Sequence, residues 1–297
     1  MSIDLIAPVL AGAAAGAFVG KLTENGIEWL IQLVGSHSKE VQKQVQKNMQ
    51  NFLVRLAKRV EILESELPTA EKDIFDKALN HPGTSLLIQK SFVSASTTDN
   101  DDRHEILSEL IVQRLTAEAD DMIALIGSAA CDIICSLSSI HIRILGFFAK
   151  LYELIPTDNS VEITEIWQTG KITKSNKIPN QEIYDDWLIG WWNTLNLITE
   201  RFDKVTTTDL RHLVALSCVG IDPIRDRELS SVIAKPLNKF SSGLKPTMKK
   251  FEAESWWPHF KHIWDIGGRR VYLTSTGLLI GILYHDSITK KKTNIRL

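Results

Sequence analysis

Apolar residues in the first half of the chain recur with helical spacing. From Val41 to Val60 they fall at every third or fourth position, while lysines and arginines occupy the other faces. This pattern predicts a long helix that begins at a Ser36 or Ser38 cap and ends near Leu67, before Pro68. Shorter helical patterns continue as far as residue 92.

A second long helical pattern follows an acidic loop. Asp101 and Asp102 are suited to cap a helix that runs from about Arg103 to Cys135, with a break at residues 118–121 as an alternative. From Met122 to Leu137 the sequence is nearly all apolar, so we expect that end of the helix to be buried on most sides.

The second half of the chain is also mainly helical. A polar stretch at residues 156–180, with a short alternating run, is expected to be a linker or insertion, followed by a tryptophan-rich helix. We therefore predict a mainly α fold with a helical domain at residues 1–155, the linker or insertion at 156–180, and a second helical domain at 181–297.

The last part of the chain contains a hairpin signal. Two extended runs surround Gly267-Gly268, and a helix capped at Thr274–Thr276 follows them. This order of a helix, a hairpin and a helix predicts a winged-helix-like end. Arg269 and Arg270 would then lie on the wing, where arginines contact nucleic acid, although winged helices also serve as protein-interaction modules.

Composition adds one asymmetry to this picture. The chain has 297 residues, 44% of them hydrophobic and 24% charged, and a net charge of −2, as expected of a globular protein that folds around its own core. Residues 241–297 carry ten Lys/Arg and four Asp/Glu. That basic excess suits nucleic acid, a lipid head group or the acidic remainder of the chain, or it is simply a solvated tail.

A search for catalytic chemistry finds no motif. The sequence has no phosphate-binding glycine loop, no dinucleotide fingerprint, no nucleophile elbow and no metalloprotease motif. Cys131 and Cys135 lie four apart in an apolar run, where burial as small hydrophobic residues explains them better than metal or redox chemistry. His259 and His262 stand among tryptophans, which favours packing over zinc. We expect no enzyme, no cofactor and no metal, and the alternative is a hydrolase or nuclease whose residues come together only in three dimensions.

The sharpest local signal lies near the beginning of the sequence. Gly12, Gly16 and Gly20 are spaced four apart within an alanine-rich, uncharged run, so on a helix they form one face that lets another backbone approach closely. Sixteen uncharged residues reach about 24 Å, short of a hydrocarbon core of roughly 30 Å. Close helix association is therefore favoured over a permanent membrane span, with insertion after oligomerisation as the alternative.

Compartment and partners follow from the same features. No basic region and cleavage site of a signal peptide precede the apolar run, and three cysteines are too few for a disulfide framework. We expect a cytoplasmic protein that forms a homo-oligomer or binds a protein partner. A membrane surface that is bound upon activation is a further candidate partner, and nucleic acid is a less favoured candidate partner.

Three stretches of the sequence carry a resemblance to a known family: His104–Ala117, Leu137–Phe148 and Leu273–Gly277. Together they resemble the Abi-alpha family of bacterial abortive-infection proteins. The first is similar to that family's leucine-rich helix, the second resembles its Leu-Ser-Pro helix start with Ser139 in place of Pro, and the third resembles its Leu-Thr-x-x-Gly motif. The glycine-rich start and the tryptophan-rich middle depart from the family's pattern.

The resemblance implies a role in bacterial defence against phage, with a helical N-terminal part and a winged-helix-like C-terminal part. It brings no catalytic residues. The leading hypothesis is thus a non-enzymatic phage-defence protein that acts by self-association or partner binding, with membrane disruption as the first mechanism. The alternative is a winged-helix regulator that binds nucleic acid.

Overall fold

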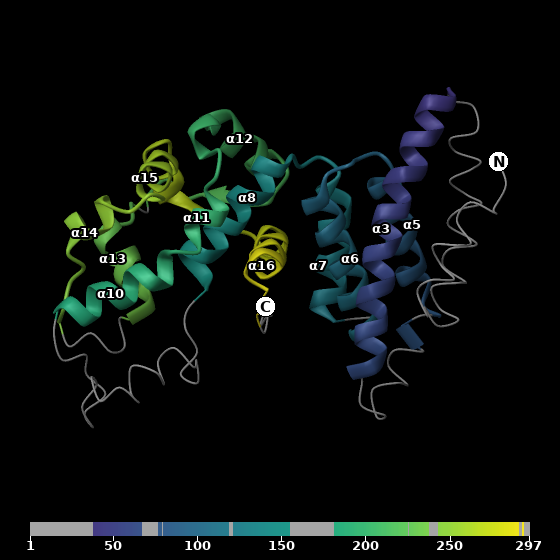
Figure 1. Ribbon diagram of the computed structural model, residues 1–297, viewed down its shortest axis with the longest axis horizontal. Coiled ribbons are helices and arrows are strands. Elements are labelled where there is room, and N and C mark those ends of the chain that lie inside the picture. The colour runs from purple at the N-terminus through teal and green to yellow at the C-terminus, as the bar shows by residue number, and fades with distance from the viewer. Residues whose placement is uncertain are drawn as a thin grey trace. The chain divides into compact units, whose positions relative to one another are not determined.

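The protein is mainly α-helical, as the sequence predicted. The computed structural model describes residues 38–66, 77–78, 80–118, 121–154, 181–224, 226–237, 243–290 and 293 (Figure 1). It divides into two compact units, one containing the described residues up to Ser139 and the other Ile140–Thr293. The sequence indicated a domain boundary at about residue 155; in this division the helix that precedes residue 155 belongs to the second unit.

The first unit contains four described helices of substantial length. They are α3 (Lys39–Glu66), α5 (Pro82–Ser96), α6 (Asp101–Thr116) and α7 (Met122–Ile134). The long first helix is confirmed, and the alternative of a break at residues 118–121 is the one observed, because α6 ends at Thr116 and α7 starts at Met122.

The second unit combines short helices with one small sheet. Its elements are α8 (Ser139–Phe148, which begins at the boundary), the π-helical turn η3 (Ala149–Glu153), α10 (Gln181–Trp192), α11 (Leu195–Ile198), η4 (Phe202–Lys204), α12 (Thr207–Ala215), β1 (Val219–Ile221), α13 (Leu229–Ala234), η5 (Lys235–Leu237), α14 (Met248–Glu252), α15 (Trp257–Asp265), η6 (Gly268–Arg270), β2 (Val271–Leu273) and α16 (Ser275–Thr289).

Helix α6 is the centre of the first unit. It packs against α3, α5 and α7 (Figure 1), and its buried side chains point in several directions around the helix. The Asn100 side chain caps it by accepting hydrogen bonds from the backbone amides of Asp102 and Arg103, at 2.9 and 3.3 Å. Helix α5 also packs against α3 and α7.

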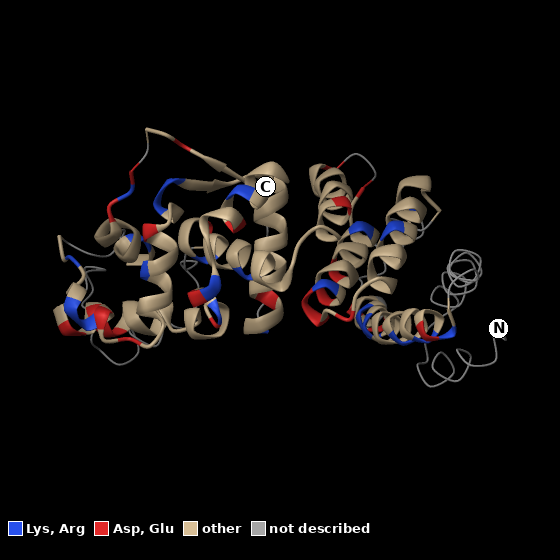
Figure 2. Ribbon diagram, turned by 90° about the horizontal axis from the view of Figure 1, so that it is seen from above, with Lys and Arg blue, Asp and Glu red and all other residues tan. Residues whose placement is uncertain are grey.

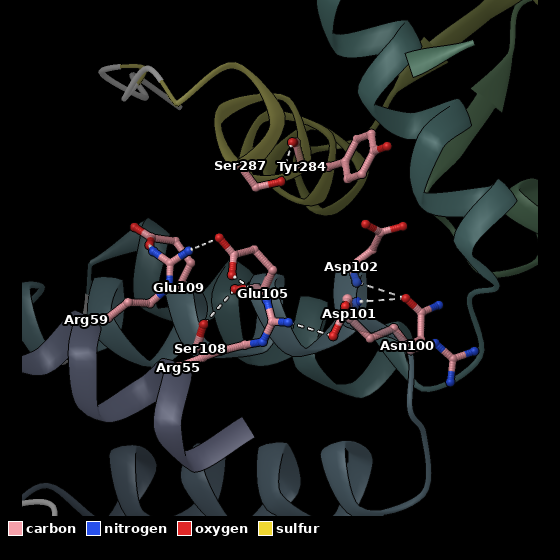
Figure 3. A network of polar contacts seen from close by, with 11 residues as sticks. Arg55, Arg59, Asn100, Asp101, Asp102, Glu105, Ser108, Glu109, Tyr284 and Ser287 are labelled. Carbon is pink, nitrogen blue, oxygen red and sulfur yellow. Dashed lines mark hydrogen bonds and ion pairs between the residues drawn. The ribbon is translucent and has the colours of Figure 1, made fainter. Parts of the chain in front are cut away.

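Ion pairs connect α3 to α6 along one edge. Arg55 pairs with Asp101 at 2.6 Å and with Glu105 at 3.4 Å, and Arg59 pairs with Glu105 at 2.5 Å and with Glu109 (Figure 3). The two arginines are one helical turn apart, and so are the successive carboxylates. This spacing fixes the register in which the two helices pack, whereas partly exposed ion pairs of this kind contribute about 1 kcal/mol or less each.

The expected hairpin around Gly267-Gly268 is wrong. The run before the glycines belongs to α15, and β2 pairs antiparallel with β1, with Val219 opposite Leu273. The run before the glycines forms a helix because its apolar residues are buried at helical spacing, which outweighs the turn preference of Gly267-Gly268. These residues are Trp257, Phe260, Ile263 and Trp264. Pro258 also suits the first turn of a helix.

Helix α16 lies unusually close to its neighbours in the second unit. A Cβ added at Gly277 would collide with the carbonyl oxygen of Cys218, and one added at Gly281 would collide with that of Leu145. Glycine spaced four apart on one face thus permits backbone-to-backbone contact on two turns of the same helix.

A buried histidine joins three segments of the first unit. His104 is fully buried, and its Nε2 lies 3.0 Å from the carbonyl oxygens of both Ala95 and Thr98, so that it donates to them. The ring edge contacts Phe52 at a centroid distance of 5.9 Å. Burial lowers the pKa of His104 below its usual value, although the two carbonyl contacts act in the opposite direction.

The His104 environment predicts acid sensitivity. Because burial lowers the pKa of His104 in the fold, the unfolded chain binds this proton more readily than the folded chain once the pH falls below about 6.5. The free energy of unfolding is therefore highest above that pH and decreases as the pH falls. Urea unfolding followed by circular dichroism at about pH 7.5 and about pH 5.5 should show a lower free energy of unfolding at the lower pH. The His104→Gln variant, which keeps a donor, should lose part of this difference.

The half-exposed His259 supplies the control for that measurement. The His259→Gln variant should keep the pH dependence of the unaltered protein. An identical pH dependence in the His104→Gln variant and the unaltered protein would show that His104 is not the group responsible.

Candidate functional site

The predicted sites fall in two very different places. Gly12, Gly16 and Gly20 lie outside the described residues, so their expected helix face stays a prediction. Arg269 and Arg270 are described and lie in η6, immediately before β2. They therefore belong to a turn that connects α15 to the sheet, and the described residues show no two-stranded wing at this point.

The two arginines differ in what they contact. The Nε of Arg269 forms an ion pair with Asp226 at 3.1 Å, which ties η6 to the loop after β1. Arg227, from the same loop, donates to the carbonyl oxygens of Arg269 and Val271. Arg270 is exposed, so of the two predicted residues it is the one whose guanidinium is presented to solvent.

Next to these arginines, the sheet presents apolar residues to solvent. Tyr272 is 47% exposed and covers Gly220 on the opposite strand, and Ile224 at the tip of the loop is 92% exposed. Arg270 and Tyr272 therefore flank one small amphipathic surface. The sequence did not reveal it, because β1 lies about fifty residues before β2.

Helix α7 carries the largest departure from the expected burial. Met122 is 62% exposed and Leu125 is 58% exposed, and Ala129 is exposed one turn later. These residues and Asp132 follow one another at intervals of three and four, so they form one stripe along the helix. The expectation that this apolar run is buried on most sides is thus wrong for one face of α7.

The stripe continues onto α5. Lys90 pairs with Asp132 at 2.7 Å, and Leu86, 51% exposed, precedes Lys90 by one turn. Leu125 precedes Asp132 by two turns, so Leu86 and Leu125 share the side of the two helices on which that ion pair lies. We call Leu86, Met122, Leu125 and Ala129, with the Lys90–Asp132 pair, the α7 face.

The α7 face is apolar and close to neutral. Its one acidic and one basic side chain pair with each other, and α7 contains no further charged residue. Elsewhere basic and acidic residues lie interspersed on the helices of both units (Figure 2). An apolar helix surface of this kind is typical of a protein–protein contact rather than of an anion-binding site.

A histidine pair lies at the start of α8 and on α12. The rings of His141 and His212 stack with centroids 4.6 Å apart, and His141 Nε2 is 3.2 Å from Asp209 Oδ1. Asp209 also accepts from the backbone amide and hydroxyl of Thr206, forming the cap of α12. Burial raises the pKa of Asp209, but these hydrogen bonds and the nearby imidazole outweigh it, so the net shift is downward.

Capping of α12 explains why a carboxylate lies beside these two histidines. Asp209 uses its oxygen atoms to accept from Thr206 and to contact His141, so it holds a helix start in place. Among the residues that the structure describes, no group of three or more His, Cys, Asp or Glu could hold a metal ion.

The other histidines and cysteines singled out by sequence have separate positions. His262 lies within hydrogen-bonding distance of the Val205 carbonyl oxygen, at 2.7 Å, in keeping with a packing role. Cys131 is buried, and burial raises its pKa to about 11, so its thiol is unreactive at neutral pH. Cys135 is exposed, contrary to the expectation that both cysteines of this pair are buried.

An aromatic cluster in the second unit includes a buried cation. Lys150, in the π-helical turn η3, is 3% exposed, and its Nζ lies 3.3 Å from the ring centroid of Trp191. Trp191 stacks on Trp187 at 5.8 Å, nearly parallel. The tryptophan-rich helix that the sequence predicted is therefore a packing platform for a lysine that sequence reasoning did not single out.

The Leu-Thr-x-x-Gly stretch has a clear structural role. Thr274 caps α16, because its hydroxyl accepts from the amide of Gly277 at 3.1 Å and donates to the carbonyl oxygen of Ser217 at 2.7 Å. The backbone amide of Thr274 also donates to the carbonyl oxygen of Cys218 at 3.1 Å. The threonine thus anchors the helix start, and the glycine admits the neighbouring backbone.

Comparison with known proteins gives a family but no activity. A model of an uncharacterised protein family matches residues 16–264. This chain belongs to that family. No curated protein and no solved structure matches the chain. Among the described residues, no helix combines the length and apolar character needed to cross a membrane.

The close approach at Gly277 predicts a large cost of adding one methyl group. Gly277→Ala should lower the free energy of unfolding by about 1–3 kcal/mol, because the new Cβ meets a backbone oxygen that cannot turn aside. A Cβ added at Gly190 in α10 would meet nothing within 4 Å, so this residue serves as the matched control. Gly190→Ala should be stabilising or neutral, since alanine favours a helix. Chemical denaturation followed by tryptophan fluorescence measures both, and equal effects would contradict the assignment.

Proposed function

We propose that this chain is a non-enzymatic interaction protein of bacterial phage defence, which acts by association of its first helical unit with another protein. The observation that carries the proposal is the α7 face. Met122 and Leu125 are each more than half exposed on a helix with a single charged residue, and that residue is already paired. Exposed apolar surface of this kind costs solubility and is usually retained for a binding partner.

The phage-defence part of the proposal rests on the resemblance to abortive-infection proteins. The stretches that carry the resemblance coincide with α6, with the start of α8 and with the cap of α16. These are packing positions: Leu137 is fully buried, and its carbonyl oxygen accepts from Arg103 at 2.6 Å. The resemblance therefore concerns packing positions in both units, and one of its stretches is α6, the helix against which α7 packs.

Membrane disruption is the first mechanism that we propose downstream of association. The glycine face of Gly12, Gly16 and Gly20 suits close packing of several copies, and short helices brought together in that way can thin a bilayer. The protein is proposed to be cytoplasmic until it is activated.

The α7 face gives a direct test of this function. Leu125→Glu places a charge at the centre of the face, while glutamate and leucine have similar helix propensities, so the fold should be retained. We expect bacteria that express the variant to lose protection in a phage plating assay, to the level of cells without the gene. Circular dichroism and protein abundance confirm that the variant is folded and present.

The matched control is Val54→Glu on α3. Val54 is 52% exposed, close to Leu125 in this respect, but it lies on another helix and outside the α7 face. The control should protect as well as the unaltered protein. Full protection by the Leu125→Glu variant would refute a function that depends on this face.

A second candidate function is nucleic-acid binding by the second unit. Strand β2, which pairs with β1, begins directly after the exposed Arg270, and α15 ends shortly before this residue. A basic residue in such a place contacts phosphate or a groove. Ion pairing of Arg269 with Asp226 leaves Arg270 as the principal contact in this alternative.

The nucleic-acid alternative makes its own quantitative prediction. Arg270→Ala should weaken DNA binding and reduce the slope of log affinity against log salt by about one, and Arg269→Ala should have a smaller effect. Lys261→Ala is the control, because Lys261 pairs with Asp265 within α15. Binding that is absent, or unchanged in the Arg270→Ala variant, would rule out this function.

A further inference from the structure

The stripe on α7 has a size pattern that can complement itself. Leu125 and Ala129 are exposed on the same side of the helix, one large and one small, at equal distances from Gly127 along the chain. When two such helices pack antiparallel about a two-fold axis at the level of Gly127, residues equidistant from it face each other. Leu125 of each copy then meets Ala129 of the other.

The charge pattern of the same helix follows the same symmetry. Asp132 and Met122 are also equidistant from Gly127, and Met122 is the first residue of α7. A carboxylate is unfavourable near the C-terminus of its own helix, where Asp132 lies, and favourable near an N-terminus. The Asp121 side chain makes no capping hydrogen bond to the start of α7. An antiparallel copy would bring its Asp132 to this uncapped end.

We infer that the α7 face is an isologous interface, at which two copies of this chain pack antiparallel through α7. This inference rests on the proposed function, since it names the partner of the face. One surface suffices for such a dimer, because every contact occurs twice about the axis. The α7 face contains the group that complements Leu125, which is Ala129, and the group that complements Asp132, which is the start of α7. A surface that binds an unrelated protein does not require such self-complementarity.

The near-neutral charge of the α7 face argues against nucleic acid and anionic lipid as its partner. Lys90 is paired with Asp132, so the face offers no unpaired cation to a phosphate group of nucleic acid or lipid. Both copies bring the same pair, and in each copy Lys90 offsets the charge of Asp132. Leu125 and Ala129 lie at the centre of the contact, and the ion pair lies nearer the rim.

A size exchange between positions 125 and 129 tests the inference. In the dimer, Leu125→Ala leaves a gap twice, and Ala129→Leu places two leucines against each other twice. Each variant should raise the Kd of the dimer by at least about tenfold in analytical ultracentrifugation. The variant with both changes restores one large and one small residue at each contact, so its Kd should return towards that of the unaltered protein.

Cysteine cross-linking tests the antiparallel register. In a Cys135→Ser background, copies with Leu125→Cys and differently tagged copies with Ala129→Cys are mixed and oxidised gently. Cys131 and Cys218 are buried and do not compete. The mixture should give more cross-linked product than either variant alone. Equal cross-linking in all three samples would overturn the register.

The outcomes separate this inference from the proposed function. A protein that stays monomeric up to about 0.1 mM overturns the inference. If the Leu125→Glu variant nevertheless loses phage protection, the face binds a different protein and the proposed function stands. A dimer that behaves as expected in the size exchange, together with full protection by the Leu125→Glu variant, supports the inference and overturns the function.

Discussion

The burial of α6 on several sides is the constraint on which the first unit depends. A helix surrounded by α3, α5 and α7 finds partners for its polar groups within the unit, among them the Asn100 cap and the two carbonyl oxygens that contact His104 Nε2. Helix α7 packs against α6 and α5, and the side that these two contacts leave exposed carries Met122 and Leu125. The α7 face is therefore the part of this helix that the core of the unit does not cover.

The second unit depends on a different constraint, which is close backbone approach at glycine. Gly277 and Gly281 place α16 against the carbonyl oxygens of Cys218 and Leu145, and Tyr284 of the same helix lies over Gly146. Packing of this kind leaves no space for a methyl group. Glycines spaced by four residues therefore act here as contact surfaces within the chain, which is the property proposed for the glycine run at residues 12–20.

The helical periods were readable from the sequence, but the contacts between distant segments were not. The spacing of Val41 to Val60 predicted α3, whereas the Gly267-Gly268 turn signal was outweighed by the buried positions of α15 and by a strand partner at Val219–Ile221. Likewise, an all-apolar run cannot reveal which of its faces the neighbouring helices cover. The sequence alone does not distinguish Leu125 from Ala130, since both lie in the same apolar run. The packing of α7 on α6 buries Ala130 and leaves Leu125 exposed.

Two carboxylates of the second unit connect its short helices. Asp209 caps α12, and Oδ1 of Asp185, buried on α10, accepts from the amide of Thr247 before α14. These carboxylates keep short helices in place. Because a fold built from many short helices has many termini to satisfy, carboxylates such as Asp209 are needed to hold the helix starts.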